Sequence, residues 1–192
     1  MKKRTAFIGA ILSLIPFGQP FFIKTGFVLS SSVVMQFLPE KLYAGDNSYY
    51  FNRAFEKAER GDHYGAISDY TIAVEINPND SDAYYNRGWS KEQLKDYYGA
   101  ISDYTKAIEI NPNDSEAYYN RGWNKDEISD YYGAISDYTK AIEINPNYKS
   151  AFKNRGIAKK KIGDLKGACS DWRQTKLLSP NDAAAIWVLD HC

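Results

Sequence analysis

The sequence repeats itself with a period of 34 residues, and this repetition limits the chain to few architectures. Residues 81–114 and 115–148 align without a gap and differ at only seven of 34 places. Weaker copies precede and follow them, over residues 47–80 and 149–182. A period of about 20–50 residues indicates a solenoid, in which each unit buries its apolar face on its neighbours. The four copies span 136 of the 192 residues, so the solenoid accounts for most of the chain.

Each unit has the pattern of a helix, a turn and a second helix. In the second unit, residues suited to the buried face recur at three- and four-residue spacing, first over residues 82–94 and again up to residue 110. Asp96 can cap the second helix by accepting backbone N–H bonds, and Pro112 ends it because proline cannot continue the hydrogen-bond ladder. The small residues Gly88, Ala100 and Ala107 would let the two helices approach closely.

The same positions resemble the tetratricopeptide repeat (TPR) family. Six of its seven signature places agree in the second unit, at Tyr84, Gly88, Ala100, Tyr104, Ala107 and Pro112. The family's remaining tyrosine is replaced by lysine in all four units, as at Lys91. The resemblance implies an all-α, right-handed superhelical solenoid of four helix-turn-helix units. The amphipathic stretch at residues 183–192 predicts a closing helix over the last unit.

The resemblance also implies that the first helices line a concave groove that holds a peptide. The groove positions carried over are Phe51, Asn52, Phe55, Tyr85, Asn86, Trp89, Tyr119, Asn120, Trp123, Lys153 and Asn154. Asparagine amides can bond to a peptide backbone, and aromatic rings supply large apolar contacts. The alternative is that the tryptophans pack between adjacent units. A clamp for a carboxylate is not expected, because the inner positions of units one to three carry no lysine or arginine.

Arginine and aspartate recur 16 residues apart in every unit. The pairs are Arg53 and Asp69, Arg87 and Asp103, Arg121 and Asp137, and Arg155 and Asp171. In a helical hairpin these positions can meet across the two helices, which favours structural ion pairs over contacts with a ligand.

The distribution of charge indicates the chemistry of a partner. The formal net charge is zero, but residues 45–148 carry 10 basic and 19 acidic residues, and the fourth unit carries nine basic and three acidic ones. An acidic body argues against nucleic acid, whose phosphates need a continuous basic surface. We therefore expect a protein or peptide partner with basic and apolar residues. The run of lysines at residues 159–161 is either a contact patch or a solvated helix face.

No constellation of residues predicts catalysis. The sequence has no glycine-rich phosphate loop, no CxxC and no HExxH motif. The histidine at position 63 stands where sister units have tyrosine, which predicts a turn residue, and His191 is next to last. We therefore expect neither an enzyme nor a cofactor or metal site.

The N-terminal segment, residues 1–44, reads as an export signal or a membrane anchor. Lys2, Lys3 and Arg4 precede an apolar run, and Ala44 follows Leu42 and Tyr43 at a plausible cleavage site. The alternatives are cleavage, an uncleaved anchor, and a segment that stays in the cytosol. The first two predict an extracytoplasmic location and restrict membrane contact to this segment.

Two cysteines, Cys169 and Cys192, are the whole thiol content of the chain. In an oxidising compartment an even number of cysteines favours pairing. The closing helix would bring Cys192 back toward the last unit, so a disulfide and two free thiols both remain open.

Two functions of different classes follow. The first is a non-catalytic adaptor or assembly scaffold that binds a peptide in its groove. The alternative is a structural protein whose units stack end to end, with the basic fourth unit of one copy against the acidic first unit of another.

Overall fold

The computed structural model describes residues 45–179 and 192. These residues form helices and contain no strand. The eight helices are α2 (Asn47–Glu59), α3 (His63–Ile76), α4 (Ser81–Gln93), α5 (Tyr97–Ile110), α6 (Ser115–Glu127), α7 (Tyr131–Ile144), α8 (Lys149–Lys161) and α9 (Leu165–Leu178).

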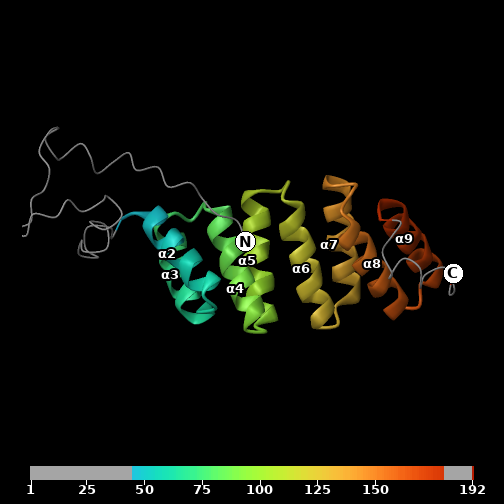
Figure 1. Ribbon diagram of the computed structural model, residues 1–192, viewed down its shortest axis with the longest axis horizontal. Helices are drawn as coiled ribbons and strands as arrows, with labels where there is room; N and C mark the ends of the chain where they lie inside the picture. Colours follow the sequence, from blue (N-terminus) through green and yellow to red (C-terminus); the bar gives the residue numbers. More distant parts are fainter. Residues whose placement is uncertain (1–44, 180–191) are drawn as a thin grey trace, which may run out of the picture.

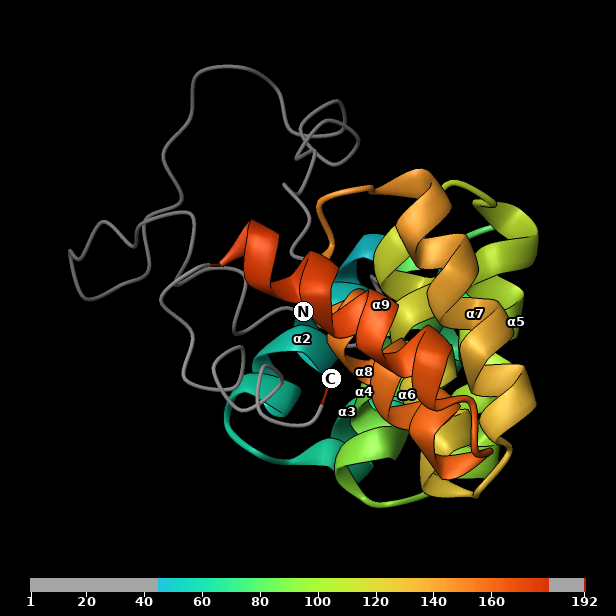
Figure 2. The same ribbon diagram turned by 90° about the vertical axis from the view of Figure 1, so that its right-hand side faces the viewer.

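The helices pack as four antiparallel pairs that follow one another in a row (Figure 1). Within the pairs, α2 packs on α3, α4 on α5, α6 on α7 and α8 on α9, and the second helix of each pair packs on the first helix of the next. Figure 2 looks along the row from its C-terminal end, with α9 in front. The prediction of an all-α solenoid of helical hairpins is confirmed.

The first helices lie on the inner side of the curved row. In the part of the chain that the structure describes, α2 approaches α4 and α6 approaches α8, whereas no two second helices come together to the same extent. A stack whose first helices are closer together than its second helices must curve toward the first helices. This surface is where the sequence places the groove.

Each hairpin turn is held by an aspartate cap. The cap residues accept a hydrogen bond from the backbone N–H three residues later and are Asp62, Asp96, Asp130 and Asp164. One residue before the cap, the backbone turns through the left-handed region, at Gly61, Lys95, Ser129 and Gly163. Glycine adopts this conformation without steric cost, whereas lysine and serine do not.

The core of each unit is built from small residues around one large ring. Ala100 and Ala107 are buried on α5, and Tyr104 between them is completely buried. A Cβ on Gly88 would lie 3.3 Å from the Tyr104 ring, so the absence of a side chain there brings α4 close to α5. The predicted close approach of the two helices is therefore present.

Two predicted segments lie outside the described residues. They are the N-terminal segment at residues 1–44 and the closing helix, of which only Cys192 is described. Within the described residues, no helix is long and apolar enough to cross a membrane.

Candidate functional site

The aromatic residues at the first groove position do not point into open solvent. Phe51, Phe55 and Tyr85 are buried, and only Tyr119 keeps partial exposure. The rings of Phe51 and Tyr85 each pack edge-on against the buried tyrosine of their own unit, with centroids 5.5 Å apart in both. Phe51 and Tyr85 therefore depart from the groove expectation, because they complete the core of the helix pair, and Phe55, one turn further along α2, is buried as well.

The asparagine amides are also used inside the protein. Asn120 Nδ2 donates to the hydroxyl of Tyr85 at 2.8 Å, and Asn154 Nδ2 donates to that of Tyr119 at 3.0 Å. Each of these bonds joins one unit to the unit before it. Asn86 is fully buried and donates to its own helix, at the carbonyl of Asp82, 2.9 Å away. The first-unit residue that stands in the place of the acceptor Tyr85 is Phe51, which has no hydroxyl to accept the equivalent bond from Asn86.

Asn86 is thus enclosed by the protein and is not at the surface that the groove prediction requires. Asn120 and Asn154 are half-buried and already bonded, and Asn52 is half-buried. Lys153, by contrast, is exposed on α8.

Trp89 and Trp123 lie at the junctions between units and remain partly exposed. Trp89 of α4 meets His63 of α3 with ring centroids 5.4 Å apart, and Trp123 of α6 meets Tyr97 of α5 at 5.9 Å. Both pairs are edge-to-face, the arrangement that aromatic rings prefer. The alternative, packing of the tryptophans between adjacent units, is thus present, and each tryptophan still keeps part of its surface exposed.

The arginine and aspartate residues that recur 16 apart do meet across each hairpin. Arg87 donates to Asp103 through Nε at 2.9 Å and through Nη2 at 2.6 Å, a two-bond arrangement that adds geometric specificity. The same contact joins Arg53 to Asp69, Arg121 to Asp137 and Arg155 to Asp171. All four aspartates are buried.

Sequence reasoning missed two further partners of this cluster. Lys91, which stands where the TPR pattern has tyrosine, pairs with Asp103 at 2.8 Å, and the equivalent lysines do the same in the other units. Arg87 Nη1 also donates to Thr71 of the preceding unit at 3.2 Å, and this bond recurs from Arg121 to Thr105 and from Arg155 to Thr139. The recurrence of lysine and threonine every 34 residues was the available signal.

The electrostatics of the cluster favour the ionised aspartate. Burial works against the charge on Asp69, but the hydrogen bonds from Arg53 and Lys57 outweigh it and lower the pKa of the carboxyl. A carboxylate paired in this way stabilises the folded state above its unfolded pKa. That contribution is lost as the pH falls through the lowered folded value.

Glu92 is a half-buried carboxyl that joins the second unit to the third. Its Oε2 accepts from Asn124 Nδ2 at 2.6 Å and from the hydroxyl of Tyr104 at 3.2 Å. Burial raises the pKa of Glu92; the two hydrogen bonds oppose that rise, and the nearby charge of Glu127 adds to it. No sequence signal marked this residue's role, because its position holds a different residue in every unit.

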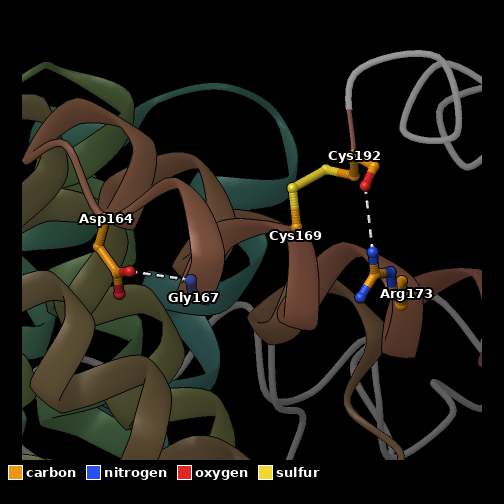
Figure 3. The surroundings of a disulfide bond; sticks show 5 residues. All are labelled: Asp164, Gly167, Cys169, Arg173 and Cys192. Atoms are coloured by element: carbon orange, nitrogen blue, oxygen red, sulfur yellow. Dashed lines mark hydrogen bonds between the residues drawn. A yellow bond between two sulfur atoms is a disulfide. The ribbon is translucent and has the colours of Figure 1, made fainter.

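A disulfide joins Cys169 of α9 to Cys192, with Cα atoms 5.6 Å apart (Figure 3). This separation lies within the usual range for bridged cysteines. Arg173, one turn further along α9, donates through Nη2 to the carbonyl of Cys192 at 3.1 Å. The end of the chain is thus tied to the last helix at two points.

Comparison with known proteins agrees with the repeat pattern. Two tetratricopeptide repeat family models match the chain, over residues 81–114 and 103–134. The chain is a tetratricopeptide repeat protein. No protein of curated function matches its sequence.

Solved structures of other TPR proteins share the fold. A crystal structure of MamA is 24% identical with a TM-score of 0.69, and the match covers 71% of this chain and 80% of that one. The TPR domain of Arabidopsis OM64 is 27% identical with a TM-score of 0.55, covering 57% of this chain and 91% of that one.

A third neighbour was solved with a ligand. The first TPR of Spaghetti (RPAP3), bound to the HSP90 peptide SRMEEVD, is 25% identical with a TM-score of 0.55, covering 57% of this chain and 87% of that one. Together with the family match, these neighbours support a protein-interaction scaffold.

Proposed function

We propose that this TPR protein is a non-catalytic interaction module that binds a peptide segment along the inner surface of its first helices. One observation carries the proposal. Trp89 and Trp123 lie on successive first helices and each keeps part of its ring exposed, although both are anchored by a second aromatic ring. A half-exposed, rigidly held tryptophan is the type of residue that dominates binding energy at protein interfaces.

The charges beside the tryptophans favour a ligand with basic residues. Glu59 and Glu127 are exposed at the ends of α2 and α6, and no lysine or arginine of units one to three stands at an inner position. The peptide bound to the RPAP3 domain, SRMEEVD, carries three acidic residues. Electrostatic complementarity predicts that the present chain selects against such a peptide and favours apolar segments of the opposite charge.

The alternative, end-to-end stacking of copies, meets an obstacle at the last unit. In units one to three a threonine accepts a hydrogen bond from the arginine of the next unit, as Thr139 does from Arg155. The fourth unit has Arg173 at this place. An arriving Arg53 would meet a like charge instead of an acceptor. Sedimentation of the full chain at low and high salt tests whether copies stack. If the chain is a monomer at both salt concentrations, stacking is excluded and the interaction module remains.

We also propose that the protein acts outside the cytoplasm. The basic N-terminus followed by an apolar run supports this, as does the pairing of Cys169 with Cys192, because disulfides persist in oxidising compartments. Mass analysis under non-reducing conditions, on protein recovered from its native compartment, tests the location. Two freely alkylated thiols would contradict it.

The groove is tested by selecting a random peptide library on the full chain and measuring the affinity of the best binder. We expect Trp89→Ala with Trp123→Ala to weaken binding by about 100-fold, since each ring is expected to contribute more than about 1 kcal/mol. The matched control is Tyr64→Ala with Tyr98→Ala, which removes two rings that are 77% and 73% exposed on the second helices. Equal affinity of the two double variants, with helicity retained, contradicts the proposal.

A further inference from the structure

The three junctions between units differ at four positions that the 34-residue period makes equivalent. At the first junction these are Ala58, His63, Trp89 and Gln93; at the second, Glu92, Tyr97, Trp123 and Glu127; at the third, Asp126, Tyr131, Ile157 and Lys161. In every junction the first two residues belong to one unit and the last two to the next. The repeat therefore allows a comparison, within one protein, of three junctions that have the same place in the fold but different side chains.

At the third junction the protein fills this location with a cation of its own. Lys161 Nζ lies 2.8 Å from Asp126 Oδ2 and 4.8 Å from the centroid of the Tyr131 ring. An ammonium held between a carboxylate and an aromatic face gains both ion-pair and cation–π energy. The backbone arrangement at the junction thus suits a lysine side chain.

At the second junction the surroundings of that cation are present, but the lysine is replaced by Glu127. Glu92 stands where Asp126 does, Tyr97 where Tyr131 does, and Trp123 meets Tyr97 with ring centroids 5.9 Å apart. Among the described residues, neither Glu92 nor Glu127 forms an ion pair. The hydrogen bonds that Glu92 accepts from Tyr104 and Asn124 both go to Oε2 and come from uncharged donors.

The two carboxylates and the two rings lie close enough to influence one another. The charge of Glu127 raises the pKa of Glu92, as described above. Burial, then the charge of Glu127 and its hydrogen bond with the hydroxyl, and then the charge of Glu92 raise the pKa of Tyr97. Two neighbouring carboxylates without a counter-cation repel each other, and a bound cation relieves that repulsion.

We propose that Glu92, Tyr97, Trp123 and Glu127 form a binding site for a lysine side chain of the bound protein segment. This site, called the second-junction site below, rests on the proposed function because it assigns a residue preference to the same inner surface. The ligand ammonium takes the place that Lys161 takes at the third junction. The first junction has no carboxylate at the equivalent positions and does not share the preference.

The site is tested with a single side chain as the probe. N-acetyl-lysine methylamide is titrated into the full, isotope-labelled chain, and N-acetyl-norleucine methylamide serves as the uncharged reference at equal ionic strength. We expect the lysine probe alone to shift the indole N–H signal of Trp123, with little change at Trp89, in titrations up to about 100 mM, a range that suits so small a ligand. Equal shifts with both probes, or no shift at Trp123, would overturn the proposal.

A charge reversal at Glu127 makes the test specific. Glu127→Lys reproduces the third junction and fills the site from within, so the response of Trp123 to the probe should disappear. Glu59→Lys is the matched control, because Glu59 holds the same place in the first unit, where no unit precedes it. Persistence of the Trp123 response in Glu127→Lys overturns the assignment.

Glu127→Gln keeps the test valid if the lysine variant does not fold. Glu127→Gln should weaken binding of the lysine probe by about tenfold, because one carboxylate is lost. Because the probe is one blocked residue, this experiment is independent of the peptide selection. If the probe binds but no peptide is selected, only the groove function is contradicted. If peptides are selected but show no lysine preference, only the second-junction site is contradicted.

Discussion

The middle units and the fourth unit share the contacts that hold a hairpin together. In all four units an arginine and a lysine neutralise a buried aspartate across the two helices. An aspartate caps each second helix, and a small residue lets the helices approach. These contacts lie within a unit, so every unit needs them wherever it stands in the row.

The fourth unit differs where the middle units receive a neighbour. Thr105 and Thr139 accept a hydrogen bond from the following unit, and Arg173 replaces them. Ile101 and Ile135 have Cys169 as their counterpart, which is bonded to Cys192. Leu165, the counterpart of Tyr97, which meets Trp123, is 60% exposed. The outer face of the fourth unit therefore lacks the groups by which a middle unit holds the unit that follows it.

The largest expected effect tests the shared contacts. Arg121→Leu should lower the free energy of unfolding by ~3–5 kcal/mol, because Asp137 stays buried with only Lys125 as partner. Arg155→Leu should cost the same in the fourth unit, and the exposed Lys140→Leu should cost little. Urea unfolding measures all three, and unequal costs for the two arginines would break the comparison.

The disulfide belongs to the fourth unit alone. Cys192→Ser should destabilise the oxidised chain by up to about 3 kcal/mol, the chain-entropy value for a cross-link across about 23 residues. Thermal unfolding with and without a reductant measures the effect. The reductant should lower the melting temperature of the wild type only, so an equal response in the variant would contradict the assignment.

Close helix approach differs between the second and fourth units. A Cβ on Gly156 would clash with the Trp172 ring at Nε1 and displace an indole that donates to the carbonyl of Lys153. Gly156→Ala should therefore destabilise by about 1–2 kcal/mol. Gly88→Ala, whose nearest neighbour would be 3.3 Å away, should be close to neutral, since alanine favours the helix. Chemical unfolding of the two variants gives the comparison, and equal costs would refute it.

The smallest effect concerns the hairpin turns. Lys95 has φ of 61°, and its counterpart in the fourth unit is Gly163 with φ of 86°. Lys95→Gly should stabilise by ~0.5 kcal/mol, because relief of left-handed strain slightly exceeds the added entropy of the unfolded chain. Gly163→Ala should destabilise by about 1 kcal/mol. Differential scanning calorimetry resolves the two, and changes of the same sign would show that the turn conformation is not the cause.

Sequence periodicity was sufficient for the contact between arginine and aspartate within a unit. The 16-residue spacing of arginine and aspartate places both on facing sides of a hairpin, and the structure brings Arg87 and Asp103 together. Contacts between units were harder to predict. The bond from Asn120 to Tyr85 depends on how far each hairpin is rotated relative to the last, and no spacing within one unit contains that angle.

The sequence by itself determined the architecture, because a 34-residue period of amphipathic helices can bury its apolar faces only by stacking. It also determined the acidic character of units one to three. Only the tertiary structure decided which inner-facing residues stay accessible: it buried Phe51, Tyr85 and Asn86 and left Trp89 and Trp123 partly exposed. The reason is geometric, since helical periodicity defines a face of each helix, whereas the neighbouring unit decides how much of that face is covered.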